Sequence, residues 1–167
     1  MIDKRILTGL GFMFVLLLIV AIVLLFGKGR NVTTDINLYY VNPTQFKLER
    51  RLVTVEGEGD LNTALTLLFL GIEDTSVENL FPAEIKFNGS NVDEENETII
   101  VDISANVLSV NYGVEVNYLY IMSIVNTVSD ITGYETVKLT FDGNIVEFFN
   151  NGLFIGQPLK RDDSVVK

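Results

Sequence analysis

Residues 116–131 read VNYLYIMSIVNTVSDI, and this stretch decides the fold of the chain. Apolar side chains recur there every three or four residues, the spacing that places them along one side of a helix. The two resulting rows are Leu119, Met122, Val125 and Ile131, and Ile121, Ile124 and Val128. Because two rows make a broad apolar surface, we expect a long, mostly buried helix that ends at Gly133.

Strands are predicted on both sides of this helix. Residues 98–103 (TIIVDI) precede it and residues 136–141 (TVKLTF) follow it, and both are rich in β-branched and aromatic side chains. Residues 85–92 form a further strand candidate, joined to 98–103 by a charged connection. Residues 145–149 (IVEFF) follow Asp142-Gly143-Asn144. Since Asp-Gly is a strong hairpin signal, we expect 145–149 to pair with 136–141.

The first half of the domain has the same rhythm. Residues 35–41 and 46–55 are predicted as two strands joined by a turn at Asn42-Pro43. Asp60 can cap a short helix that stops at Gly71, and residues 77–82 are predicted as a packed loop. The order ββαββαββ predicts a single α+β domain in which two helices pack on a mixed sheet.

An apolar segment precedes the domain. Residues 6–26 read ILTGLGFMFVLLLIVAIVLLF and contain no charged side chain, and a helix needs about 20 residues to cross hydrocarbon. A cleaved signal peptide is the competing interpretation, but the segment is long and no small-residue cleavage site follows it. The predicted organisation is therefore a short tail (1–5), a transmembrane helix (6–26), a linker (27–34), the domain (35–161) and a tail (162–167).

Charge is distributed unevenly along the chain. Residues 31–167 hold 8 Lys and Arg against 21 Asp and Glu, a formal charge of −13, whereas residues 1–30 hold 4 against 1, or +3. A domain this acidic is repelled by nucleic-acid phosphates and anionic lipid head groups, so we expect no nucleic-acid binding. Two basic residues flank each end of the apolar segment, so charge alone leaves its orientation open.

The residue types limit the chemistry. The chain has no Cys and no His, which removes thiol nucleophiles, disulfides and the commonest general base and metal ligand. The acidic run Asp93, Glu94, Glu95 and Glu97 lacks the pattern of a calcium loop, and Gly57-Glu58-Gly59 lacks that of a phosphate loop. We expect no catalytic residue, no cofactor-binding residue and no metal site, and therefore no enzyme.

Three further sets of polar residues have structural interpretations. Asp102 and Asp142 are nominal candidates for a carboxylate pair, although turn chemistry already explains Asp142. Asn126 and Thr127 lie in the middle of the buried helix, where they can hydrogen-bond a strand edge or the preceding turn. Tyrosines are predicted to be core and interface residues, because no base or metal accompanies them. They are Tyr39, Tyr40, Tyr112, Tyr118 and Tyr120.

An ordered set of short motifs resembles the GerMN domain, the sporulation and spore germination domain of bacteria. The motifs are Leu52-Val53, Asn62-Thr63-Ala64-Leu65 with Leu67-Leu68, Phe81-Pro82, Val101-Asp102-Ile103-Ser104, Ile124-Val125-Asn126-Thr127, and Val137 followed by Asp142-Gly143. The chain departs from the pattern at residues 71–74, where Gly-Pro is common, at Val128, where leucine is usual, and in having a single copy. It also lacks a lipobox cysteine, so residues 6–26 would supply the anchor.

The resemblance implies an extracytoplasmic α/β module that acts through protein contacts. We therefore expect a single-pass protein of the cell membrane in a spore-forming bacterium, linked to sporulation or germination. Its partners would be envelope proteins or further copies that form a homo-oligomer or ring. The alternative is a ligand-binding or sensory module that recognises cell-wall fragments or a small solute, for which the tyrosines and the acidic loop would form the surface.

Overall fold

The computed structural model describes residue 13 and residues 16–18, 32–74, 76–150 and 152–167. Two compact units separate along the chain, Met1–Val32 and Thr33–Lys167. Every residue of the buried hydrophobic cluster, from Ile36 to Ile155, belongs to the second unit. Thr33–Lys167 therefore contains a complete core of its own and is the domain described below.

A long hairpin begins the domain. β1 (Thr33–Asn42) and β2 (Lys47–Glu56) pair antiparallel over their full lengths, from Thr33 opposite Glu56 to Asn42 opposite Lys47. β1 becomes more buried toward its end, where Leu38 and Tyr39 are inaccessible to solvent. The two predicted strands and their turn are confirmed.

The first helix, α2 (Leu61–Leu70), has the predicted signals at both ends. The Asp60 carboxylate accepts a hydrogen bond from the Thr63 backbone N–H at 2.9 Å, which satisfies one free donor of the first turn. The N–H of Gly71, at φ 80°, returns to the carbonyl of Leu67. The apolar face of α2 packs on β1 and on α3.

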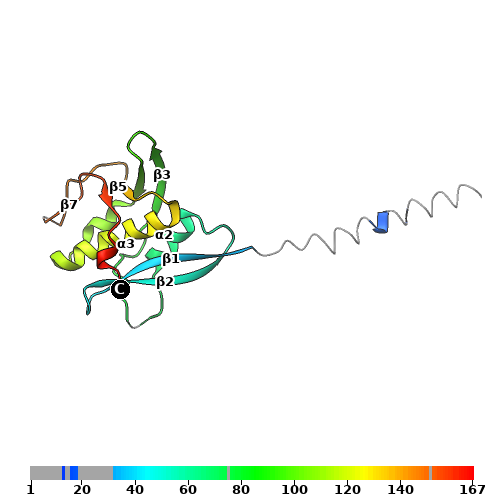
Figure 1. Ribbon diagram of the computed structural model, residues 1–167, viewed down its shortest axis with the longest axis horizontal. Coiled ribbons are helices and arrows are strands. Elements are labelled where there is room, and N and C mark those ends of the chain that lie inside the picture. Colours follow the sequence, from blue (N-terminus) through cyan, green and yellow to red (C-terminus); the bar gives the residue numbers. More distant parts are fainter. Residues whose placement is uncertain (1–12, 14–15, 19–31, 75, 151) are drawn as a thin grey trace, which may run out of the picture. The chain divides into compact units, whose positions relative to one another are not determined.

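The second helix, α3 (Val114–Thr132), is the centre of the fold. A short 3-10 turn, η1 (Ala105–Ser109), precedes it, and Gly133 ends it in the left-handed conformation. Twelve of its residues are buried, from Asn117 to Ser129, so the predicted buried helix is confirmed. In Figure 1, α2 and α3 lie between the β1–β2 hairpin and β3 to β5, and each helix contacts both groups of strands.

The main sheet has four strands in the order β3-β4-β5-β8. They are β3 (Phe87–Asp93), β4 (Thr98–Ile103), β5 (Thr136–Phe141) and β8 (Leu159–Lys160). β3 and β8 run antiparallel to their neighbours, whereas β4 and β5 are parallel and are joined through η1 and α3. The sheet is mixed, so the predicted α+β class is confirmed, although the strands form three sheets and not one.

The predicted hairpin between 136–141 and 145–149 is wrong. Asp142 and Gly143 do form a tight turn with positive φ, but pairing stops at the single bridge between Phe141 and Asn144. β6 (Phe148–Phe149) pairs with β7 (Leu153–Phe154) instead, and β8 takes the edge of β5. Burial explains the difference, because Phe149 and Ile155 enter the core at 1% and 0% exposure and draw the chain away from β5.

Residues 162–167, predicted as a tail, are held against the domain. Asp162 caps a second 3-10 turn, η2 (Asp163–Val165). Val166 bridges to Leu48, and the N–H of Lys167 donates to the carbonyl of Leu48 at 2.9 Å. The fold therefore uses the chain as far as Lys167.

The predicted transmembrane helix at 6–26 lies almost wholly outside the described residues. Among the residues that are described, no helix has both the length and the apolarity needed to cross a membrane. The membrane span therefore stays a prediction from the sequence.

Candidate functional site

The structure brings the nominal carboxylate pair together. Asn88, on β3, donates from its amide nitrogen to both Asp102 and Asp142 at 3.0 Å. Asp102 also accepts from Thr140 and from the backbone N–H of Gly143. Although burial opposes ionisation of Asp102, the hydrogen bonds from Gly143, Thr140 and Asn88 lower its pKa. These carboxylates tie the 142–143 turn to the sheet.

The acidic turn between β3 and β4 is also organised by its own side chains. Asp93 accepts from the backbone N–H of Asn96 at 3.2 Å and from its side-chain amide at 2.9 Å, and these bonds lower its pKa. Within the described parts of the chain, no group of three or more carboxylates has an arrangement that could hold a metal ion. The expectation that the chain needs no metal stays untested.

Asn126 and Thr127 tie three elements together. The Asn126 side chain donates to the carbonyl of Asp162 at 2.9 Å and accepts from its N–H at 3.1 Å, so it pairs with the backbone as a neighbouring strand would. The Thr127 hydroxyl accepts from the N–H of Tyr39 on β1 at 3.2 Å. The two fully buried side chains thus satisfy backbone groups of β1 and of the segment that follows β8.

Most of the five tyrosine hydroxyls form hydrogen bonds with partners inside the domain. Tyr40 donates to the carbonyl of Leu67, Tyr112 to that of Leu80, and Tyr118 to Asp162. Burial raises the pKa of Tyr118 to about 12, and Asp162 contributes to the shift. The Tyr120 ring stacks on Phe149 at 5.6 Å between centroids, while its hydroxyl is buried without a partner among the described residues.

An ion cluster at the end of α3 was not expected from the sequence. Arg161 donates to Asp130 at 2.9 Å and to the Tyr39 hydroxyl at 2.8 Å, and its guanidinium lies 5.4 Å from the Tyr39 ring centroid. Asn37 donates to the other Asp130 oxygen at 2.8 Å. The sequence gives no sign of this cluster, because its members come from β1, from α3 and from the residue that follows β8.

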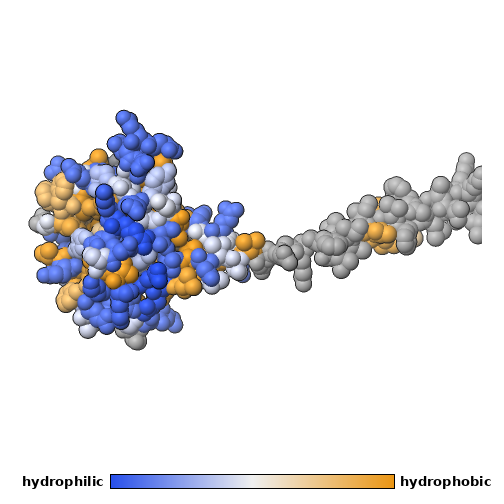
Figure 2. All heavy atoms as spheres, viewed as in Figure 1, coloured by the Kyte–Doolittle hydropathy of each residue, from blue (hydrophilic) through white to orange (hydrophobic). Residues whose placement is uncertain are grey.

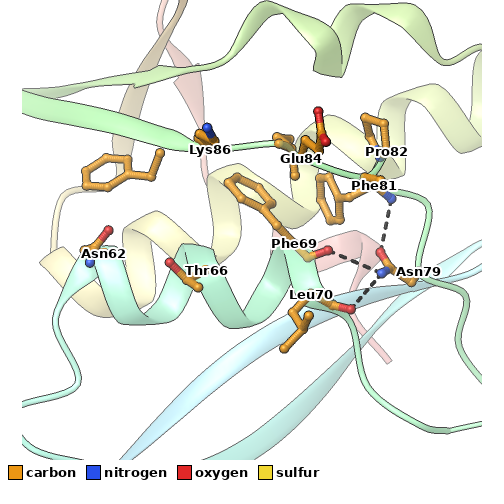
Figure 3. Close-up of a pocket in the computed structure, with 12 residues that line it drawn as sticks. Asn62, Thr66, Phe69, Leu70, Asn79, Phe81, Pro82, Glu84 and Lys86 are labelled. Atoms are coloured by element: carbon orange, nitrogen blue, oxygen red, sulfur yellow. Dashed lines mark hydrogen bonds between the residues drawn. The ribbon is translucent and has the colours of Figure 1, made fainter.

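An apolar groove lies between α2 and the chain that leads into β3, and Figure 3 shows its walls. Its volume is about 720 Å³. Phe69 and Leu70 line it from α2, and Phe81, Ile85 and Phe87 line it from the opposite wall. The predicted loop at 77–82 thus supplies one apolar anchor to the core, Leu80, and one to this groove, Phe81.

Asn79 links the two walls of the groove. Its amide donates to the carbonyls of Phe69 and Leu70 at 3.3 and 2.9 Å, and its oxygen accepts from the N–H of Phe81 at 3.1 Å. Gly71 lies directly beside it, since a Cβ atom there would lie 2.5 Å from the Asn79 amide nitrogen. These bonds satisfy two carbonyl groups at the C-terminal end of α2. They also fix the distance between that end and the loop at residues 77–82.

A second hollow, of about 740 Å³, is polar. The acidic turn forms one side of it with Glu94 and Glu97, and Tyr134, Glu135 and Lys160 form the other. This hollow combines part of the predicted acidic surface with a tyrosine that the sequence did not single out.

Comparison with known proteins agrees with this architecture. A "Tandem GerMN domains" structure of the sporulation protein GerM from Bacillus subtilis superposes with a TM-score of 0.57 at 18% identity, over 78% of this chain and 46% of that one. The first GerMN domain of the same protein gives 0.55 at 20% identity, over 77% and 96%. A candidate lipoprotein from Clostridium perfringens gives 0.53 at 19% identity, over 78% and 89%.

These identities establish a shared fold and nothing more specific. A search of curated proteins gives no significant match. The family model described as "Sporulation and spore germination" matches residues 37–147, which is more than half of the chain and includes both helices. The chain therefore belongs to this family, Germane, as the motifs around Asp102, Asn126 and Asp142 predicted.

Proposed function

We propose that the Thr33–Lys167 domain is a protein-interaction module of the cell envelope in a spore-forming bacterium, held at the outer face of the membrane by residues 6–26. Family membership supports the link to sporulation or germination. The uncharged segment 6–26 supports the anchor. The resemblance of the fold to a candidate lipoprotein is consistent with a domain attached to a membrane surface.

The observation that carries the interaction role is an exposed aromatic pair on an acidic domain. Phe148 on β6 lies opposite Phe154 on β7, with ring centroids 5.3 Å apart, and the two side chains are 54% and 45% exposed. Figure 2 shows apolar side chains gathered in this region, where Figure 1 places β7. Contiguous exposed apolar patches, unlike single apolar side chains, mark sites of protein contact.

Membrane attachment would strengthen a weak contact. Domains held on one surface meet at a high effective concentration, so a modest interface suffices for assembly. The contacts would join copies of the domain, as in a homo-oligomer or ring, or join it to another envelope protein.

Self-association of Thr33–Lys167 tests this proposal, measured by sedimentation free in solution and by negative-stain imaging of the domain tethered to lipid vesicles. Near-physiological salt is needed so that the −13 charge of residues 31–167 is partly screened. Defined oligomers on vesicles that disappear in Phe148→Ser would support contact between copies. A monomer in both settings would remove copies as partners and leave a different envelope protein to be found by crosslinking.

The polar hollow supports ligand binding as a second candidate function. Carboxylates, an amine and a phenol converge there, which suits a polar solute or cell-wall fragment. Titration with soluble cell-wall fragments, followed by chemical shifts of Tyr134 and Lys160, separates the two candidates. Shifts confined to these residues would favour the ligand-binding function.

A further inference from the structure

We propose that the groove between α2 and β3 binds an extended segment of a partner protein that adds a strand to β3. The segment would place an apolar side chain against Leu70 and would carry Lys or Arg where it passes the turn at residues 93–97. This proposal rests on the interaction role proposed above and gives the domain a second contact surface, apart from the Phe148–Phe154 pair, with a stated partner chemistry.

The edge of β3 next to the groove is open. β3 is the terminal strand of its sheet, paired only with β4 among the described strands. The N–H of Lys86 donates to the Ser104 hydroxyl at 2.8 Å, and the Lys86 carbonyl accepts from the Ser104 N–H at 2.9 Å. Because backbone groups alternate along a strand, the N–H and C=O groups of Phe87, the first residue of β3, face away from β4. They offer hydrogen bonds to an added strand.

The groove also offers a place for an apolar side chain. Leu70 is 73% exposed at the end of α2, and the Phe69 and Phe81 rings lie 4.9 Å apart beside it. The Asn79 hydrogen bonds fix the position of Leu70 relative to Phe81 before any partner arrives. A helix on one side and an open strand edge on the other form the arrangement in which extended peptides add to a sheet.

Charge identifies the kind of partner. Among the described residues that line the groove, Glu84 and Lys86 are the only charged ones and their charges balance, so the charge that selects a partner lies beyond the groove. At the far end of β3, the exposed turn carries Glu94, Glu95 and Glu97, and Figure 2 shows the tip of this hairpin as hydrophilic. A second copy of this acidic domain would be repelled there, whereas a basic segment would be attracted.

The length of β3 sets the spacing within the partner segment. β3 has 7 residues, and a strand advances about 3.3 Å per residue, so β3 spans roughly 20 Å. The apolar residue and the first basic residue should therefore lie at least about six positions apart.

Fluorescence anisotropy with the full chain in mild detergent tests the proposal. The probe is the labelled peptide LVTVSVTKKR, in this order and reversed, because an added strand can run in either direction. We expect one order to bind with a dissociation constant of about 10–100 μM. The peptide LPTPSPTKKR keeps the charge but lacks three backbone donors, so we expect it to bind at least about tenfold more weakly.

Two variants locate the site. Leu70→Arg puts a cation in the groove and should weaken binding about tenfold. Leu52→Arg makes the same change at a leucine of similar exposure, 67%, outside the groove, and should change binding less than about twofold. Three results would overturn the proposal: equal binding of LVTVSVTKKR and LPTPSPTKKR, no binding of LVTVSVTKKR or of its reverse, or equal effects of Leu70→Arg and Leu52→Arg on binding.

The failure of this proposal is distinguishable from that of the proposed function. If no peptide binds while the tethered domain still assembles, only the groove assignment fails. If Leu70→Arg abolishes self-association, the occupant is a second copy and the assignment of a basic partner is wrong. Peptide binding without any partner at the envelope would contradict the proposed function alone.

Discussion

Replacing Tyr120 by Phe should stabilise the domain, whereas the same change at Tyr39 should destabilise it. Both residues are fully buried. The Tyr120 hydroxyl has no hydrogen-bond partner among the described residues, and burial raises its pKa. The Tyr39 hydroxyl contacts Asp130 at 3.3 Å and accepts from Arg161 at 2.8 Å. The same change from Tyr to Phe therefore removes an unpaired hydroxyl at residue 120 and a hydrogen-bonded hydroxyl at residue 39.

The magnitudes follow from these surroundings. A buried polar group without a partner costs roughly 1–3 kcal/mol. Tyr120→Phe removes that cost and keeps the ring stacked on Phe149, so we expect a gain of about 1 kcal/mol. Tyr39→Phe loses two hydrogen bonds to charged groups that keep other partners, so we expect a loss of about 1–2 kcal/mol.

Urea unfolding of the Thr33–Lys167 domain measures both changes, with the midpoint compared at unchanged m-value. Tyr118→Phe is a further reference, because its hydroxyl donates to Asp162 at 2.7 Å and its loss should also destabilise. If Tyr120→Phe lowers the midpoint as much as Tyr39→Phe does, the Tyr120 hydroxyl is hydrogen-bonded and the reasoning is refuted.

Three further predictions concern stability. Asn126→Ala leaves two backbone groups without partners and should cost about 2–3 kcal/mol in urea unfolding; a loss below about 0.5 kcal/mol would contradict its structural role. Although burial opposes ionisation of Asp130, hydrogen bonds from its partners lower its pKa, so its contribution is present above about pH 4 and is lost as the pH falls. Asp130→Asn should make the loss of stability at acid pH less steep. An unchanged dependence on pH would show that Asp130 does not cause this loss. At Gly133, which has φ 78°, an alanine Cβ would meet no neighbouring atom, so Gly133→Ala should cost about 1 kcal/mol through the strained backbone alone. At Gly71 the Cβ would also displace Asn79, so Gly71→Ala should cost more. Thermal unfolding that ranks the two variants in the reverse order would contradict this.

Most local elements could be predicted because their signals are local. Asp60 and Gly71 mark the ends of α2 within one helical turn each, and Gly133 ends α3 in the same way. The two apolar rows of residues 116–131 belong to a helix that is buried on nearly every side. These features depend on neighbours a few positions apart, which the sequence displays directly.

Features that depend on distant pairing could not be predicted. The Asp142-Gly143 turn is present as predicted, but β6, the strand that follows it, pairs with β7 and not with β5. This pairing depends on the burial of Phe149 and Ile155, which the whole core decides. The pairing of β8 with β5 covers only two residue pairs, too short to leave a pattern. The groove could not be predicted either. An apolar residue at a helix end, such as Leu70, looks in the sequence like a residue of the core.

The location of the domain is the claim on which the proposed function depends most, and cysteine labelling tests it directly. The chain has no cysteine, so Glu95→Cys, in the exposed β3–β4 turn, and Lys4→Cys each introduce a single thiol. Both full chains would be produced in growing bacteria that lack an outer membrane and treated with a membrane-impermeant maleimide. A membrane-anchored, extracytoplasmic domain predicts labelling of the residue-95 thiol in intact cells and of the residue-4 thiol only after permeabilisation. The opposite pattern, or protection of both thiols until lysis, would contradict it.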